Sequence, residues 1–245
     1  MKGKILIIKT GNTIPSLLEQ HEDFEDWFID GSGLDSSHFL CCAVDRGEAL
    51  PAIEDIVGAI VTGSPAYLTD LAPWNEIAAD YLRILHAQQK PILGVCYGHQ
   101  LLAWAFGGEV GFHPRGREIG TVNLELTQEA TVDALFAEMP MQFSAQASHL
   151  QSVLSLPKEA VLLAKNSFDA HHAFRLGSST WGVQFHPEFS AQVMSAYLCE
   201  RSEDITGEGL NVEELLASVR ATPISAGLLK QFAALSIDLL KKGVG

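Results

Sequence analysis

The residue with the clearest chemical context is Cys96, which lies between two glycines in Pro91-Ile-Leu-Gly-Val-Cys-Tyr-Gly-His-Gln100. An apolar run leads into this cysteine, and an amphipathic segment follows it as far as Gly107-Gly108, a typical helix stop. A Cβ at position 94 or 98 would crowd a sharp bend from strand to helix. The pattern predicts a nucleophile elbow that presents the thiol, with a buried packing cysteine as the alternative. The remaining cysteines lack this context and are interpreted as packing residues: Cys41, Cys42 and Cys199.

A cysteine nucleophile needs a nearby positive charge, because an ordinary thiol is only a few per cent thiolate at neutral pH. Among the nine histidines, His186 in Trp181-Gly-Val-Gln-Phe-His-Pro-Glu188 has the strongest context. Pro187 disfavours a helical conformation before it, so Glu188 is expected to lie on the same side of an extended chain as His186. We predict that His186 is the general base and that Glu188 orients its ring. A hydrogen-bonded structural histidine is the alternative.

A third segment, Ala59-Ile-Val-Thr-Gly-Ser-Pro65, is typical of a strand that ends in a turn. One main-chain N–H from this turn and the N–H of Tyr97 would form a two-donor hole for a carbonyl oxyanion. Because Pro65 has no N–H, the turn's donor must be Ser64 or Gly63. An ordinary turn without this role is the alternative.

Composition excludes several classes of protein. The 30 acidic residues outnumber 16 Lys and Arg and give a net charge of −14, which argues against a nucleic-acid partner. A hydrophobic content of 47% indicates a folded core, and no apolar run reaches the roughly 18–20 residues of a membrane span. Four cysteines in a chain of this length indicate a reduced, cytoplasmic protein. No feature of the sequence sets an oligomeric state.

Metal ions and cofactors are not expected. The pair His171-His172 is the sole local hint of a metal site. No cysteine or carboxylate stands at ligand spacing from this pair, and neighbouring residues on a strand point to opposite sides.

The first half of the chain alternates continuous apolar runs with segments of helical period. The runs predict buried parallel strands at 5–8, 59–61 and 91–95, and the segments 16–29 and 75–89 predict helices between them. The run at 5–8 is interpreted as a strand rather than as part of a signal peptide. This alternation is typical of an α/β fold with a doubly wound, mostly parallel sheet, which binds ligands at the carboxyl ends of its strands.

The second half changes character. Strand patterns at 121–127, 141–147 and 160–165, and a hairpin of 172–176 with 180–185, predict antiparallel edge strands.

The last part of the chain reads as helical. Helices are expected at 191–200, 212–219 and 226–241, with a polar connection at 201–209. We interpret residues 1–245 as a single domain, with a core of about 1–190 and a helical extension of about 191–245. The apolar stripes of the extension are expected to pack on the chain's own core, with a partner-binding surface as the alternative.

Together the motifs resemble those of the triad-type (class I) glutamine amidotransferases, most closely the glutaminase domain of GMP synthase. Gly94-Val-Cys-Tyr-Gly-His-Gln100 and Gln184-Phe-His-Pro-Glu188 are signatures of that family and occur in the same order, over about residues 1–190. The resemblance implies a flavodoxin-like fold in which Cys96 is the nucleophile, His186 the base and Glu188 its acidic partner.

The resemblance also implies a substrate site. The family's oxyanion donors fall on Tyr97 and on Ser64, where the family usually has glycine. The positions that hold the α-amino and α-carboxylate groups of glutamine fall on Gln100, Ser148, His149, Leu150 and Gln151. Relatives close to GMP synthase often have an acidic residue where Gln151 stands, so this chain departs from them at that contact. No motif of an ATP-pyrophosphatase domain occurs in the sequence, so we expect a stand-alone protein rather than GMP synthase itself.

These features predict hydrolysis of a γ-glutamyl amide through a cysteine thioester. One substrate hypothesis is free glutamine, with ammonia passed to a separate synthase subunit. Another is a γ-glutamyl peptide or amine that the chain hydrolyses alone. The hypothesis from a different class is a non-catalytic regulatory or binding module, against which the intact cysteine, histidine and glutamate count.

Overall fold

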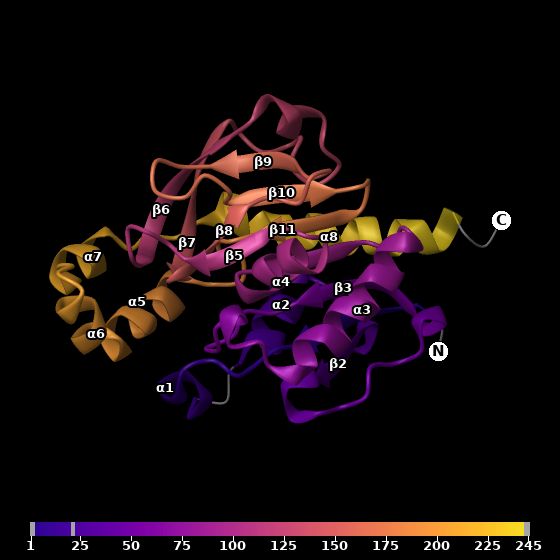
Figure 1. The fold of residues 1–245 in the computed structure, drawn as a ribbon, viewed down its shortest axis with the longest axis horizontal. Helices are drawn as coiled ribbons and strands as arrows, with labels where there is room; N and C mark the ends of the chain where they lie inside the picture. The colour runs from indigo at the N-terminus through magenta and orange to yellow at the C-terminus, as the bar shows by residue number, and fades with distance from the viewer. Residues whose placement is uncertain (1–2, 21–22, 243–245) are drawn as a thin grey trace.

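The computed structural model describes residues 3–20 and 23–242 and is organised around a nine-stranded sheet (Figure 1). The strand order is β2-β1-β3-β4-β11-β10-β9-β6-β7, and the strands from β2 to β11 pair in parallel. The parallel half consists of β1 (Lys4–Lys9), β2 (Phe39–Ala43), β3 (Ile56–Val61), β4 (Ile92–Val95) and β11 (Thr180–Val183).

The other half of the sheet is antiparallel. It continues from β11 through β10 (Ala173–Leu176), β9 (Val161–Lys165), β6 (Glu118–Leu126) and β7 (Gln142–His149). A separate two-stranded sheet pairs β5 (Glu109–Phe112) with β8 (Gln151–Ser155). The fold is therefore a mixed, mostly parallel sheet with added antiparallel strands, as the sequence predicts.

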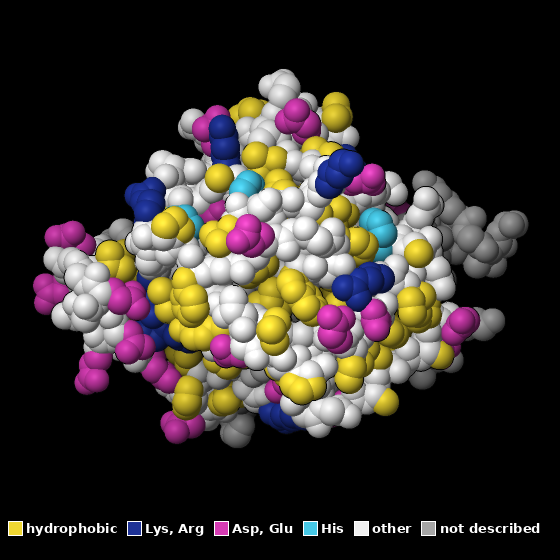
Figure 2. All heavy atoms as spheres, in the orientation of Figure 1, with side chains coloured by type: hydrophobic (Ala, Val, Ile, Leu, Met, Phe, Trp, Pro, Cys, Tyr) yellow, Lys and Arg dark blue, Asp and Glu magenta, His cyan; other side chains and the backbone are white. Residues whose placement is uncertain are grey.

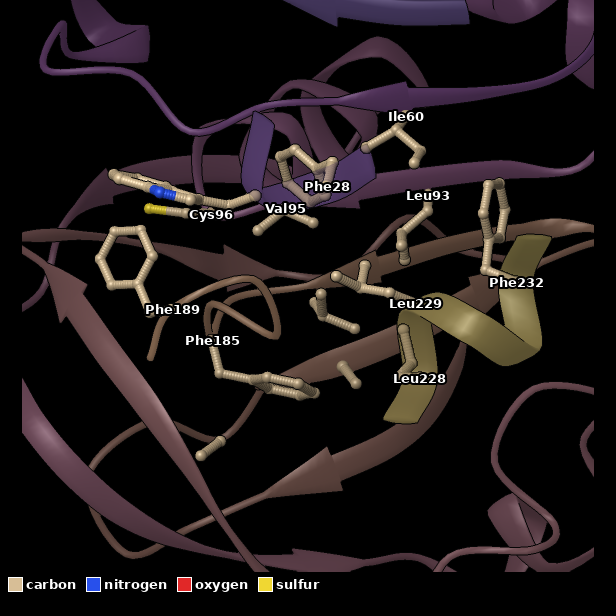
Figure 3. Close-up of a cluster of buried hydrophobic side chains, with 14 of the residues drawn as sticks. Phe28, Ile60, Leu93, Val95, Cys96, Phe185, Phe189, Leu228, Leu229 and Phe232 are labelled. Atoms are coloured by element: carbon tan, nitrogen blue, oxygen red, sulfur yellow. The ribbon is translucent and has the colours of Figure 1, made fainter. Parts of the chain in front are cut away.

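Helices cover both faces of the parallel half of the sheet. Alternate side chains of β1 point to opposite faces and pack in two different hydrophobic clusters. Ile7 packs in the cluster that includes Phe28 of α2 (Phe24–Ser32) and Phe232 of α8 (Pro223–Lys242). Figure 3 shows part of this cluster, with Leu93 of β4 between α8 and Phe28. The neighbouring residues of β1 pack on the opposite face against α3 (Pro73–Ala87) and α4 (Tyr97–Ala105).

Short helices complete the chain. Four of them lie together at one end of the molecule, at the lower left in Figure 1: α1 (Pro15–Leu18), α5 (Ala191–Glu200), α6 (Ser202–Gly207) and α7 (Val212–Ser218). The single-turn 3-10 helices are η1 (Ser36–His38), η2 (Val44–Arg46), η3 (Ile53–Asp55), η4 (Leu68–Asp70) and η5 (Gln128–Val132). No helix among the described residues is both long and apolar enough to cross a membrane.

Several expectations about individual elements were wrong. The predicted helix at 16–29 is two helices, because Asp23 caps α2 in a capping box with Asp26. The predicted polar connection at 201–209 contains helix α6, which buries Ile205. Cys42 is buried as expected, but Cys41 and Cys199 are exposed.

The helical extension packs on the sheet rather than standing apart from it. On α8, the side chains of Leu228, Leu229 and Phe232 are buried against the core cluster. On α7, Leu215 and Leu216 are partly buried against the same cluster. The expectation that the extension packs on the chain's own core is therefore confirmed for these residues.

Phe232→Ala should destabilise the whole chain by about 3–5 kcal/mol, because it leaves a cavity between α8 and the sheet. Phe232 is 0% exposed, whereas Ile224 on the same helix is 46% exposed. Ile224→Ala is therefore the matched control, with an expected change within about 0.5 kcal/mol. Chemical denaturation measures the free energy of unfolding of both variants. A loss for Phe232→Ala as small as that for Ile224→Ala would show that α8 is not part of the cooperative core.

Candidate active site

Three neighbouring parallel strands deliver the predicted residues to one edge of the sheet. β3, β4 and β11 are adjacent, with Val61 paired to Gly94 and Val183 paired to Val95. Because parallel strands end at the same edge, Ser64, Cys96 and His186 follow their strands into a common region. The position of β11 beside β4 explains how residues distant in sequence come together.

Cys96 occupies a strained bend. Its backbone has φ 52° and ψ −99°, a conformation that residues with a side chain rarely adopt. Its N–H donates to Val183 O at 2.8 Å, which ties the bend to β11. A Cβ at position 94 would overlap the carbonyl oxygen of Gly98, and one at position 98 would overlap that of Val61. The expectation that a Cβ at either glycine would crowd the bend is confirmed.

His186 and Glu188 form a buried pair. His186 Nδ1 lies 2.7 Å from Glu188 Oε1, and both side chains are almost completely buried. Burial alone lowers the pKa of His186, but the charges of Glu188 and Cys96 and its hydrogen bonds with both raise it to about 10. With Nδ1 on Glu188, the other ring nitrogen is left to face the sulfur. The arrangement favours the charged, imidazolium form of His186 beside the sulfur.

Aromatic packing fixes the plane of the imidazole. The His186 ring stacks on Phe189 with a centroid distance of 4.0 Å and an interplanar angle of 16°. Phe189 in turn packs against Tyr197 of α5, with ring centroids 4.8 Å apart. On the side of β3, a Cβ on Gly63 would lie 3.0 Å from His186 Cε1. The ring is therefore held between packed neighbours and has little freedom to rotate away from the sulfur.

The two predicted oxyanion donors lie near the thiol. Tyr97 is the first residue of α4, so its N–H has no acceptor within the helix. Ser64 follows β3, and its hydroxyl donates to Thr10 O at 2.6 Å, which fixes the turn. Ser64, Tyr97 and Cys96 line the same cavity. Of the two candidate donors in this turn, Ser64 lines the cavity and Gly63 does not.

Most of the predicted site residues line one cavity of about 540 Å³. Glu188 lies outside its lining, behind His186, as an orienting group should. The predicted residues that line the cavity are Ser64, Cys96, Tyr97, Gln100, Ser148, His149, Leu150, Gln151 and His186.

The predicted substrate residues present few free polar groups. Gln100 Nε2 donates to Gln151 O at 2.8 Å and to Gln184 Oε1 at 3.1 Å. The Gln151 side chain is turned to η4, where it accepts from Leu68 N and donates to Thr69 Oγ1. Ser148 and His149 are the last residues of β7, Gln151 is the first residue of β8, and Leu150 lies between the two strands. The Gln151 amide therefore serves the fold and is 2% exposed.

Sequence reasoning missed one wall of the cavity. The N-terminal loop contributes Asn12 to Pro15, and the helical extension contributes Tyr197, Glu200, Arg201 and Asp204. Arg117 also lines the cavity and forms a two-pronged ion pair with Glu208, at 2.7 and 2.8 Å. This pair links β6 to the end of α6 and fixes the position of the wall. No local motif marks these residues, since the helices were interpreted as packing elements.

His172 lies in a buried polar cluster that the sequence did not predict. Glu118 Oε2 lies 3.0 Å from His149 Nε2 and 2.8 Å from His172 Nε2. The three ligand atoms lie within 4.8 Å of one another, a grouping that could hold a metal ion. Glu118 is distant in sequence from both histidines and comes from β6, so residue spacing alone could not indicate it. Burial raises the pKa of Glu118, but the two histidines lower it by more, so the pKa is lowered overall.

Comparison with known proteins defines the class. The sequence model of the family described as "Glutamine amidotransferase class-I" matches residues 44–203. The chain therefore belongs to the class I glutamine amidotransferases.

Relatives of known name include GMP synthases and γ-glutamyl peptidases. A GMP synthase [glutamine-hydrolyzing] of Aeropyrum pernix is 33% identical over 213 residues, which are 81% of this chain and 39% of that protein. Gamma-glutamyl peptidase 4 of Arabidopsis thaliana is 28% identical over 144 residues, 58% of this chain and 57% of that protein. The chain thus spans about two fifths to three fifths of the length of these two relatives.

A solved structure confirms the fold. A glutamine amidotransferase from Methylobacillus flagellatus is similar with a TM-score of 0.73 and 25% identity, over 98% of this chain and 95% of that one. A second, from Thermotoga maritima, has a TM-score of 0.76 at 19% identity, over 96% of this chain and 98% of that one. The predicted flavodoxin-like amidotransferase fold is confirmed.

Glu188→Gln should lower the pKa of His186 from about 10 toward its ordinary value near 6.5, because the neighbouring negative charge is lost. A raised folded-state pKa stabilises the protein only while the group is protonated. The stability advantage of wild type over Glu188→Gln is therefore full below about pH 6.5 and is lost as the pH rises through about 10. NMR titration of the ring and denaturation across this range measure both effects. An unchanged ring titration in the variant would contradict the assigned cause.

Proposed function

We propose that this chain is a cysteine-dependent hydrolase of γ-glutamyl amides that forms a thioester on Cys96. The observation that carries the proposal is the convergence of Cys96 and His186 in one cavity, with Glu188 paired to the far side of the His186 ring. Relatives named as a glutamine-hydrolysing synthase and as a γ-glutamyl peptidase support the same chemistry. A non-catalytic module has no need for a strained cysteine beside a buried imidazole and carboxylate.

The first half-reaction releases the amine. The Cys96 thiolate attacks the carbonyl carbon of the γ-glutamyl amide, and the negative charge moves to the carbonyl oxygen. The N–H groups of Ser64 and Tyr97 donate to that oxygen. Protonated His186 then gives its proton to the departing nitrogen, so the C–N bond breaks and ammonia or an amine leaves. A γ-glutamyl thioester and a neutral imidazole remain.

The second half-reaction releases glutamate. His186 takes a proton from water as the water oxygen attacks the thioester carbon. The same two N–H groups stabilise the second oxyanion, and the C–S bond breaks to give glutamate and a thiolate. Glu188 holds the ring in place and stabilises the imidazolium that forms in this step.

The size of the cavity favours substrates larger than free glutamine as a second candidate. Its volume of about 540 Å³ falls in the range typical of sites for drug-sized ligands. A γ-glutamyl peptide or amine could therefore be hydrolysed by the chain alone. For free glutamine, a relative in Methanocaldococcus jannaschii is named as one subunit of a glutamine-hydrolysing GMP synthase, which supports a separate synthase partner that receives ammonia.

Cys96→Ala should lower glutamate release from L-glutamine and from γ-glutamyl amides by about 10³-fold or more, because no other group can form the thioester. Steady-state glutamate release measures this rate. Cys41→Ala is the matched control, since Cys41 is exposed on the edge strand β2 and lies outside the cavity lining. Full activity of the Cys96→Ala protein would exclude the proposed mechanism.

The isolated chain should release glutamate from γ-glutamylalanine without any partner protein, because the cavity has room for a substituent on the amide nitrogen. Chromatographic detection of alanine and glutamate measures the reaction. Turnover of glutamine only, and only when a synthase partner is added, would favour the amidotransferase role over the peptidase role.

A further inference from the structure

A γ-glutamyl substrate carries two charges at its far end, an α-ammonium and an α-carboxylate. Both must leave water when the substrate enters the cavity, and a desolvated charge requires a polar or charged partner. The segment 148–151 supplies no carboxylate for this purpose, because position 151 is glutamine. The Gln151 side-chain amide is already hydrogen-bonded to Leu68 N and Thr69 Oγ1. Gln100 is also neutral. Charged side chains on another wall would therefore supply partners of opposite charge that these neutral side chains lack.

We define the α5–α6 wall as Tyr197, Glu200, Arg201 and Asp204. It carries the charged lining residues other than Arg117. Packed rings connect this wall to the predicted triad: the His186 ring stacks on Phe189, and Phe189 packs against Tyr197. The Tyr197 hydroxyl is bonded to Thr13 Oγ1 at 2.8 Å, which fixes the ring against the N-terminal loop. The wall is therefore built on packed side chains close to the thiol.

Arg201 is the cation of this wall that is left for a ligand. Arg117 lines the cavity as well, but both prongs of its ion pair are taken by Glu208. The Arg201 guanidinium lies over the Tyr197 ring, 5.7 Å from its centroid. Its Nε is buried and has no hydrogen-bond partner among the residues that the structure describes. A part-buried guanidinium that lies over an aromatic ring and has an unpaired N–H is a typical carboxylate-binding group.

The residues beside Arg201 are acidic. Glu200 and Asp204 are exposed, and Glu200 Oε2 accepts from Ser16 N at 3.3 Å. Figure 2 shows acidic side chains gathered at the end of the molecule where α6 and α7 lie. One guanidinium flanked by two carboxylates complements a zwitterion, in which an ammonium and a carboxylate lie on the same carbon. A substrate with an isolated carboxylate would be repelled by the same neighbours.

We propose that the α5–α6 wall binds the amino-acid head of the γ-glutamyl substrate, with Arg201 binding the α-carboxylate and Glu200 and Asp204 attracting the α-ammonium. The proposal rests on the proposed function, because it places the γ-carbonyl at Cys96. It assigns to the helical extension the charge recognition that an acidic residue at position 151 could provide in relatives.

The test compares glutamine with two analogues that each lack one charge. 4-Aminobutanamide lacks the α-carboxylate, and glutaramate lacks the α-ammonium. The kcat/KM for ammonia release from each compound gives two selectivity ratios that cancel changes common to all substrates. The variants are Arg201→Gln, Arg201→Lys and the double variant Glu200→Gln with Asp204→Asn. Arg115→Gln is the matched control, since Arg115 stacks on Phe168 at 4.7 Å and lies outside the cavity lining.

Arg201→Gln should lower the preference for glutamine over 4-aminobutanamide by at least about tenfold, because a charge-assisted hydrogen bond is lost. Arg201→Lys should restore part of this preference, which a purely structural role would not explain. The double acidic variant should instead lower the preference for glutamine over glutaramate. Arg115→Gln should leave both ratios as in wild type.

Two outcomes would overturn the proposal. One is a carboxylate preference in Arg201→Gln within about twofold of wild type. The other is a loss that appears only between γ-glutamylalanine and γ-glutamylethylamide, which differ by one carboxylate on the leaving group. Such a loss would place Arg201 at the leaving amine instead.

Failure of the proposed function is distinguishable from both. It would appear as wild-type turnover no greater than that of Cys96→Ala for every compound. In that case, calorimetric titration of Cys96→Ala with glutamine and the two analogues still tests the wall. Tighter binding of glutamine than of 4-aminobutanamide that is lost with Arg201→Gln supports it, and equal affinities overturn it.

Discussion

The adjacency of β3, β4 and β11 is the constraint on which the site depends. Parallel pairing forces all three strands to end at one edge of the sheet, so the residues that follow them share a small volume. Ser64, Cys96 and His186 each occupy such a position. The helices on both faces bury the strands and hold their register, and the hydrogen bond from Cys96 N to Val183 O ties the bend to β11. Displacement of β11 would therefore separate the sulfur from the imidazole without altering either residue.

Strain and burial are concentrated at the same place. Cys96 has a positive φ, and the glycines two residues before and after it allow α4 to approach β4 and β3 more closely than any side chain would permit. His186 and Glu188 are buried as a pair, which is stable only while each has its partner. The surrounding core must hold these features, which explains why the aromatic rings of Phe24, Trp27 and Phe189 are packed against one another directly beside the imidazole.

Much of this arrangement could be predicted from sequence because the relevant signals are local. The apolar runs at β1, β3 and β4 and the glycines around Cys96 specify their own conformations. Strand β2 was missed because Phe39–Ala43 is short and lies at an edge of the sheet, and its buried and exposed residues do not alternate. Helix α6 was missed because Ile205 is its one buried residue among those described. The role of Gln151 in holding η4, and the place of Arg201 on the cavity wall, depend on contacts between distant segments that no spacing rule encodes.

The position of β11 also has a consequence for the order of assembly during synthesis. The chain completes β4 and the elbow, then makes the entire antiparallel half before β11 returns to the place beside β4. Pairing between such distant segments forms late in folding. A nascent polypeptide that has emerged only as far as α4 therefore lacks His186, the residue proposed as the base for Cys96, because that part of the chain has not yet been translated. The topology therefore keeps Cys96 without its imidazole neighbour until the ribosome has translated every strand of the sheet.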